Sequence, residues 1–250
     1  MTDPAVPPGG SGLRVVVAGD AEQAAVVVAR TIRAAVEVDP SCRLGLATGA
    51  TPSPAYRLLV HELATTDLFV DVTAFLLDEY VGLPTGDPAS YRATIRRELT
   101  DAIGVPAERV HAPVTTGDLE ASCADYESLL GSGVDLQLLG IGRNGHLGFN
   151  EPGTPFEWTT HVVELSATTR SDNARFFASP DLVPTHAVTQ GLATIGRARH
   201  LLLAATGAAK APAVAAALEG PLDTACPASS LRLHPRVTVV LDRDAAGDLS

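Results

Sequence analysis

The chain has 250 residues, 46% of them hydrophobic and 19% charged, which is typical of a globular protein and excludes a disordered or fibrous one. Its 18 basic and 29 acidic residues leave a net charge of -11, so neither nucleic acid nor an anionic membrane is an expected partner. The 3 cysteines lie far apart and outside any metal-ligand spacing, so we expect free thiols and no metal site.

The start of the chain has the composition of a loose tail. Residues 1–12 hold 3 prolines and 3 glycines but no basic or apolar region of the kind found in signal peptides. No later run approaches the roughly 18 apolar residues of a membrane span. We therefore expect a cytoplasmic protein made of this tail and a single α/β domain over residues 13–250.

Short apolar, β-branched runs alternate along the chain with longer Ala-rich stretches that have the apolar spacing of helices. The predicted strands are 13–18, 44–47, 72–77, 134–139, 200–205 and 237–241, and the predicted helices are 21–36, 54–64, 90–103, 118–130 and 208–218. This alternation predicts a mostly parallel, doubly wound, Rossmann-like sheet with helices on both faces. Residues 153–190 are less regular and contain several aromatic residues, so we expect either an active-site lid or a small subdomain over the sheet there.

The polar residues that follow the strands are the first candidates for a site, because ligands of open parallel sheets bind beyond the carboxyl ends of the strands. The turn Thr48-Gly49-Ala50-Thr51 follows the strand at 44–47. Its glycine and the free backbone amides of the next helix suit an anion such as phosphate. Taken alone, such a turn is more often ordinary loop chemistry.

A second turn of the same build, at 206–210, follows the strand at 200–205 and ends in Lys210, the only lysine among the 18 basic residues. Lys210 falls in the first turn of a predicted helix, where the helix dipole disfavours a cation unless an anion lies between them. A solvated surface lysine is the ordinary alternative. A chain that uses arginine everywhere else favours a phosphate ligand at this position.

Two adjacent carboxylates, Asp78 and Glu79, follow the strand at 72–77. Successive side chains of an extended segment point in opposite directions, so we expect one carboxylate to face the cleft as a base while the other pairs elsewhere. A helix cap or a solvated turn is equally compatible with this segment.

The segment 140–145 matches the dinucleotide pattern GxGxxG, but we reject a dinucleotide site. That pattern must open a helix in the first βα unit, whereas glycine and proline soon break any helix here. What remains is His146 on a glycine-rich loop with Glu151 five residues on, which predicts a proton shuttle with an orienting carboxylate. An isolated histidine is more often structural, but four loops together predict proton transfer on a phosphorylated small molecule.

Three strings carry a family resemblance: LDEYVGLP at 77–84, NGHLGFNEP at 144–152 and LRLHP at 231–235. The chain there resembles the glucosamine-6-phosphate deaminase (isomerase) family, and segments 48–52, 169–170, 173–177 and 207–210 match as well. The likeness covers about residues 15 to 242 in order. It implies hydrolytic deamination and isomerisation of glucosamine 6-phosphate to fructose 6-phosphate and ammonia, with no cofactor and no metal.

The resemblance also implies roles for individual residues. His146 would open the sugar ring by moving a proton to the ring oxygen, with Glu151 setting its tautomer, and Asp78 would shuttle a proton between C2 and C1. Asn144 stands where many members have an aspartate, so it is expected to orient His146 by a hydrogen bond without stabilising its cation. The expected phosphate ligands are Thr48, Gly49, Ala50, Thr51, Lys210 and, in the lid, Arg175.

Two other functions are the alternatives to deamination. A 6-phosphogluconolactonase shares the fold and the phosphate site, but its relatives typically have an arginine where Tyr80 stands. A sugar-phosphate-sensing domain of a transcription regulator would need a DNA-binding module, and only the short tail precedes the first predicted strand. Tyr80 and the short tail therefore both favour the deaminase. The sequence is also compatible with a homo-oligomer.

Overall fold

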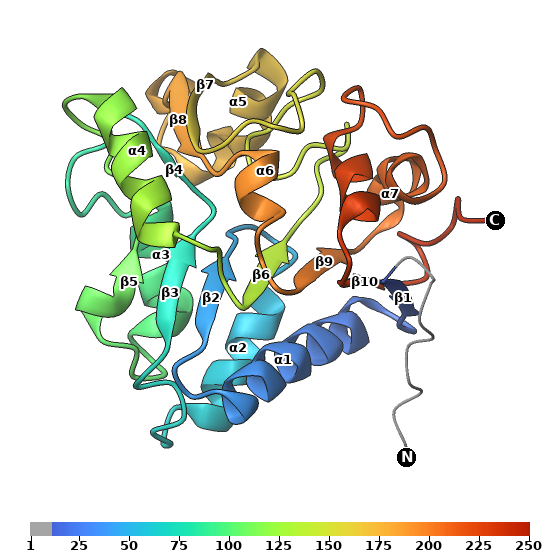
Figure 1. Cartoon of the computed structure of the whole chain (residues 1–250), viewed down its shortest axis with the longest axis horizontal. Helices are drawn as coiled ribbons and strands as arrows, with labels where there is room; N and C mark the ends of the chain where they lie inside the picture. Colours follow the sequence, from blue (N-terminus) through green and yellow to red (C-terminus); the bar gives the residue numbers. More distant parts are fainter. Residues whose placement is uncertain (1–11) are drawn as a thin grey trace.

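The computed structural model describes residues 12–250, which form a seven-stranded sheet in the order β1-β10-β9-β6-β2-β3-β5 (Figure 1). Every neighbouring pair in it is parallel. Its strands are β1 (Leu13–Val17), β2 (Arg43–Leu46), β3 (Thr73–Leu76), β5 (Val110–His111), β6 (Leu136–Leu139), β9 (Leu201–Ala205) and β10 (Val237–Leu241). Six of these strands were predicted, whereas β5 has only 2 residues and carries no pattern. The tail expected at 1–12 lies, except for Gly12, outside the described residues.

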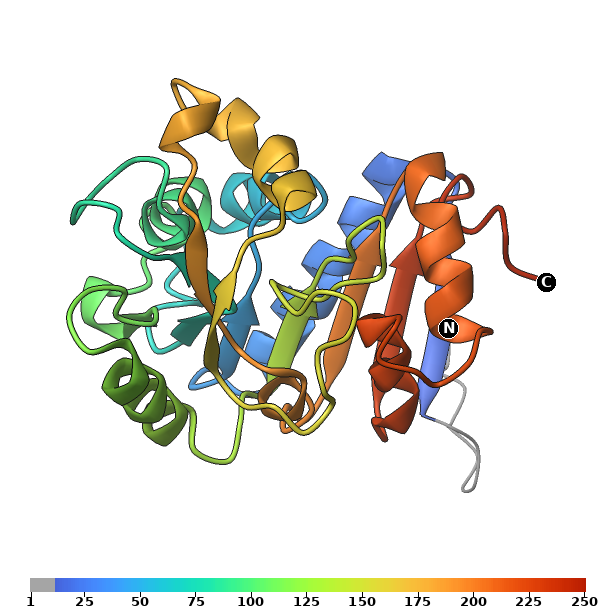
Figure 2. The ribbon, with the colours of Figure 1, turned by 90° about the horizontal axis from the view of Figure 1, so that it is seen from above.

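Helices cover both faces of the sheet, as predicted (Figures 1 and 2). One face carries α1 (Ala21–Val38), α2 (Ser53–Leu63) and α3 (Tyr91–Ile95), and the other carries α4 (Leu119–Leu130), α6 (Leu192–Ile195) and α7 (Ala211–Leu218). The two cores follow from the alternation of side chains along each strand. In β9, Leu202 and Ala204 belong to the first core, and Leu201 and Leu203 belong to the second.

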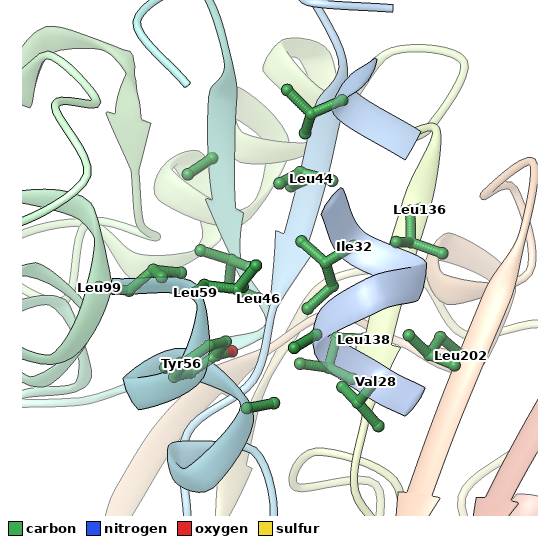
Figure 3. Close-up of a cluster of buried hydrophobic side chains, with 14 of the residues drawn as sticks. Val28, Ile32, Leu44, Leu46, Tyr56, Leu59, Leu99, Leu136, Leu138 and Leu202 are labelled. Atoms are coloured by element: carbon green, nitrogen blue, oxygen red, sulfur yellow. The ribbon is translucent and has the colours of Figure 1, made fainter. Parts of the chain in front are cut away.

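Helix α1 shows why these residues fold as predicted. The side chain of Asp20 accepts a hydrogen bond from a backbone amide in the first turn and so caps the helix. Val28 and Ile32 lie one turn apart and face the sheet at Leu138 and Leu202, all four at most 2% exposed (Figure 3). Burying side chains of this size contributes roughly 1.5 to 3 kcal/mol each.

A second, antiparallel sheet in the order β4-β8-β7 lies beside the first. It contains β4 (Asp78–Tyr80), β7 (His161–Glu164) and β8 (His186–Thr189), and α5 (Ala167–Asn173), η3 (Ala174–Phe176) and η4 (Pro180–Leu182) connect β7 to β8. In Figure 1 the β7, α5 and β8 segment lies above the parallel sheet, on the side of α4 and α6. Residues 153–190 are therefore more regular than expected. The strand β7 was not predicted because it is partly exposed along its length and its sequence shows no apolar alternation. A lid function for this segment stays a prediction.

Two predicted helices are only partly α-helical. The helix expected at 90–103 divides into α3 and a wide π-helical turn, η1 (Arg96–Thr100), and the helix expected at 208–218 begins with the 3₁₀ turn η5 (Ala208–Lys210). The remaining short turns are η2 (Ala107–Arg109) and η6 (Pro227–Leu233). Within residues 12–250, no helix combines the length and apolarity needed to cross a bilayer.

Candidate active site

The predicted site residues, except for Arg175 on η3, follow β2, β3, β6 and β9, which are consecutive neighbours in the sheet (Figure 1). Their carboxyl ends therefore meet at one edge. Three glycines in these loops, Gly49, Gly140 and Gly207, face open space, because a Cβ added to each would meet no atom within 4 Å. Gly49 and Gly207 have φ angles of 120° and 88°, a backbone conformation that favours glycine. A ligand can thus approach the backbone of several adjacent loops.

Asp78 is a buried carboxyl at the point where the chain leaves the parallel sheet. It opens β4, pairs with Thr189 of β8 and is only 6% exposed. Burial, together with the neighbouring charge of Glu79, holds the pKa of Asp78 well above its usual range. The raised pKa makes this carboxylate a stronger base than an ordinary one, which is the property expected of a group that abstracts a proton from carbon.

Glu79 is directed to different partners, as the alternation predicts for one of the two carboxylates. Its oxygens accept hydrogen bonds from the backbone amides of Tyr80 and Tyr91, both at 2.9 Å, and of Arg92 at 2.8 Å. Two of these amides belong to the first turn of α3, so Glu79 caps that helix. Burial raises the pKa of Glu79, and the three amides oppose that rise. The helix cap that was an alternative role for the Asp78–Glu79 segment is therefore formed by Glu79, at the start of α3.

His146 and Glu151 lie together on the loop that follows β6. His146 Nδ1 is 3.7 Å from Glu151 Oε2. Gly142 permits this ring position, because a Cβ there would lie 2.3 Å from the imidazole. Asn150, fully buried, pins the loop by donating hydrogen bonds of 2.8 Å to the carbonyls of Leu147 and Gln190. No helix opens in residues 140–150, which agrees with the rejection of a dinucleotide site.

Asn144 orients the pair through Glu151 and the backbone. Its Nδ2 donates a 2.8 Å hydrogen bond to Glu151 Oε2, and its Oδ1 accepts from the backbone amide of His146 at 3.3 Å. The expected hydrogen bond between Asn144 and His146 is thus made to the main chain and not to the ring. Asn144 holds the carboxylate that faces the imidazole.

The second oxygen of Glu151 is held by α5. Thr169 donates a hydrogen bond to Oε1, and Ser166 Oγ lies 3.3 Å from the same atom. His146 beside it, and hydrogen bonds from Thr169 and Asn144, lower the pKa of Glu151 to about 2 against the opposing effect of burial. Glu151 is therefore a carboxylate at neutral pH. Neither Ser166 nor Thr169 was predicted to have a role in the site, although serine is a preferred residue at a helix N-cap, where Ser166 lies.

Lys210 connects two of the loops. It ends η5, just before α7, and its Nζ donates a 2.7 Å hydrogen bond to the carbonyl of Ile141 beside the His146 loop. The turn is held by Asp242, which follows β10 and accepts from the amide of Gly207 with both oxygens at 3.0 Å. Asp242 was not predicted as a site residue, although it comes just after a strand, as Asp78 and the Thr48 turn do.

Two predicted phosphate ligands stand apart from these contacts. The side chain of Thr48 lies beside that of Tyr91. The Tyr91 hydroxyl in turn lies 3.2 Å from the Tyr80 hydroxyl. Arg175 is exposed on η3, and its guanidinium lies 4.8 Å from the ring centroid of Phe176. The structure thus places Arg175 on the predicted lid, and its binding of phosphate stays a prediction. Among the described residues, no three His, Cys, Asp or Glu side chains are grouped as a metal site.

The family model described as glucosamine-6-phosphate isomerases/6-phosphogluconolactonase matches residues 19–240. The chain belongs to this family. A glucosamine-6-phosphate deaminase of Pseudarthrobacter chlorophenolicus is 47% identical over 240 residues, covering 95% of this chain and 93% of the relative. One of Streptomyces coelicolor is 44% identical over 242 residues, covering 95% and 93%.

Solved structures of the family resemble the fold closely. A monomeric glucosamine-6-phosphate deaminase superposes with a TM-score of 0.90 at 44% identity, covering 94% of this chain and 99% of that one. A 6-phosphogluconolactonase from Trypanosoma brucei superposes with a TM-score of 0.79 at 22% identity, covering 96% and 100%. The second likeness is one of fold alone.

Proposed function

We propose that the protein is a glucosamine-6-phosphate deaminase, which converts glucosamine 6-phosphate and water to fructose 6-phosphate and ammonia. The observation that carries the proposal is the separation of two proton-transfer groups at the carboxyl ends of two strands, β6 and β3, that flank β2 in the sheet. The His146–Glu151 pair lies after β6, and the buried carboxyl of Asp78 lies after β3. Ring opening and carbon acid chemistry need two such groups acting at different atoms of one sugar.

His146 takes the proton of the C1 hydroxyl and delivers it to the ring oxygen, so that the bond between C1 and the ring oxygen breaks and an aldehyde forms at C1. The carboxylate of Glu151 faces Nδ1, which favours the tautomer with the proton on Nδ1 and leaves Nε2 for the substrate. Asn144 and Thr169 keep that carboxylate in place. The open aldehyde then carries its amino group on C2, next to the carbonyl carbon.

Asp78 acts next by taking the proton from C2, which gives an enolamine, and by returning it to C1. The resulting C2 imine is attacked by water and loses ammonia, which leaves the ketone of fructose 6-phosphate. The raised pKa of Asp78 makes its carboxylate a stronger base than an ordinary one, which suits the abstraction of the C2 proton, and the same carboxyl group then delivers that proton to the neighbouring C1.

The phosphate would occupy the edge formed by the turns at Thr48–Thr51 and Gly207–Lys210. The open backbone of Gly49 and Gly207 and the ammonium of Lys210 support this placement. Arg175 would add a second cation from the predicted lid.

The alternative within the family, a 6-phosphogluconolactonase, is disfavoured by Tyr80. This side chain is 1% exposed and packs against Tyr91, Phe149 and Phe177 at ring-centroid distances of 4.8 to 5.7 Å. It is part of an aromatic core, so position 80 supplies no cation to the site, whereas an arginine is expected there in a lactonase.

The decisive experiment measures ammonia release from glucosamine 6-phosphate beside hydrolysis of 6-phosphogluconolactone, with the same enzyme preparation. The Asp78→Asn variant is the control for contaminating deaminase. Ammonia from the first substrate and no hydrolysis of the second supports the proposal. Lactone hydrolysis without ammonia release would replace it.

A further inference from the structure

We propose that Thr169, supported by Ser166, is a positioning residue for the Glu151–His146 pair, and that the pair is set only while α5 is seated against Glu151. The inference rests on the proposed function in so far as His146 moves the proton in ring opening. It assigns to the first turn of α5 a part in the chemistry, in addition to any closing over the substrate.

The two oxygens of Glu151 are held by different parts of the chain. Oε2 accepts from Asn144 and faces His146, all on the loop after β6. Oε1 accepts from Thr169, which is 6% exposed and belongs to α5. The terminal torsion of a glutamate is broad, so a carboxylate held by one oxygen alone rotates easily. The contact with α5 is what fixes the plane of the carboxylate toward the imidazole.

The hydroxyls form a chain that ends on the carboxylate. Ser166 Oγ lies 3.0 Å from Thr169 Oγ1, and it also accepts from the backbone amide of Thr169 at 3.1 Å as the cap of α5. Each hydroxyl has one proton to donate, so donation by Thr169 to Glu151 leaves its oxygen free to accept from Ser166. Such a chain strengthens the bond to the charged end.

The same segment carries a predicted phosphate ligand. Arg175 lies on η3, which follows α5 directly, so Thr169 and Arg175 are six residues apart on adjoining helical turns. A substrate whose phosphate engages Arg175 would thereby hold the segment that orients Glu151. Binding at one end of the sugar and proton transfer at the other would then depend on one small element.

A simple capping role for Thr169 is separable from this proposal by one substitution. Thr169→Val keeps the side-chain shape and the backbone amide that Ser166 accepts from. It removes the Thr169 hydroxyl and leaves Ser166 Oγ, 3.3 Å from Glu151 Oε1, in place. Thr168→Val is a matched control, because Thr168 is the exposed neighbour on the same helix. Thr169→Ser restores the hydroxyl.

The expected result is a fall in kcat of about 10- to 100-fold for Thr169→Val, the size associated with one lost hydrogen bond to a charged group, with KM changed less than about threefold. Thr169→Ser should recover most of kcat, and Thr168→Val should match the parent enzyme. The Thr169→Val defect should shrink on an open-chain substrate analogue, because that substrate bypasses ring opening. Equal defects on open and closed substrates would overturn the assignment.

A second measurement does not depend on activity. The ¹⁵N chemical shifts of the His146 ring report its tautomer, which we expect to be mainly Nδ1–H in the parent protein and mixed in Thr169→Val. An unchanged tautomer together with an unchanged kcat in the folded variant would refute the proposal. A shifted tautomer in a protein that releases no ammonia would uphold the positioning role and reject the proposed function. If Thr169→Val fails to fold, Thr169→Ala is judged by the same two measurements.

Discussion

Replacing Asp78 by asparagine should abolish most activity and at the same time stabilise the protein. The substitution keeps the shape of the side chain and removes the proposed base. General acid or base groups typically contribute about 10² to 10⁴ in rate, so we expect kcat to fall by that factor, or about 2.7 to 5.5 kcal/mol in the barrier. Binding of phosphate ligands should survive, because Asp78 lies after β3 and the phosphate turns follow β2 and β9.

The stabilising effect follows from the burial of Asp78. Its carboxyl is 6% exposed, and both burial and the charge of Glu79 raise its pKa. A group whose folded-state pKa is raised contributes stability that is full below its unfolded pKa, about 3.9, and is lost as the pH rises through the folded pKa. Asparagine stays neutral and escapes this loss, so Asp78→Asn should be more stable than the parent at pH 8 and equal to it near pH 4.

The magnitude expected at pH 8 is that of a favourable single substitution, on the order of 1 kcal/mol, or roughly 2 to 4 °C in Tm for a chain of this length. Thermal melts at the two pH values and ammonia-release kinetics measure the two effects on one preparation. Glu79→Gln is the comparison for turnover alone, since it removes the adjacent carboxylate without removing the proposed base but also loses an acceptor of the α3 cap. Near-normal turnover by Asp78→Asn would refute the reasoning and move the base to another residue, Glu79 first.

Two further substitutions test the other groups of the site. Lys210→Ala should raise KM for glucosamine 6-phosphate far more than it lowers kcat, because a phosphate contact is made in the ground state and the transition state alike. Steady-state kinetics measure this effect, with glucosamine as the comparison substrate. Equal turnover of glucosamine and glucosamine 6-phosphate would contradict the phosphate site. His146→Gln should slow a step before deamination, because glutamine does not move protons near neutral pH. An open-chain analogue should restore much of its rate, and an identical defect on both forms would place His146 elsewhere in the mechanism.

The sheet and its strand-end loops are predictable from sequence because both rest on local patterns. Apolar runs locate the strands, and a parallel arrangement places Asp78, His146 and Lys210 at one edge without knowledge of the strand order. The contacts of Thr169 and Asp242 are not predictable in this way. Thr169 reaches Glu151 only because the small antiparallel sheet seats α5, and that sheet has no periodic sequence signal in β7. Pairing between distant, irregular segments is decided by packing, and sequence periodicity does not record it.

The last prediction concerns Asn144→Asp, which introduces the residue that many family members have at this position. Asn144 Nδ2 now donates to Glu151 Oε2 at 2.8 Å, so an aspartate there would set two carboxylates against each other. Two like charges about 4 Å apart repel by about 1 kcal/mol in water and about 4 kcal/mol at an effective dielectric constant of 20. The pair would relieve this by holding a proton, which raises its apparent pKa above the value of about 2 that Glu151 has now.

The sign of the resulting pH dependence is opposite to that of the parent protein. At present Glu151 stabilises the fold above about pH 4.5, and this contribution is lost as the pH falls toward 2. In Asn144→Asp the raised pKa of the pair makes the variant lose stability, relative to the parent, as the pH rises through that pKa. Asn144→Ala removes the donor without adding charge, so its loss of stability should not vary with pH between 4.5 and 8. Urea unfolding of the parent and the two variants across this pH range measures the difference. If the unfolding free energies of Asn144→Asp and Asn144→Ala change with pH in the same way, the two carboxylates at positions 144 and 151 do not interact as proposed.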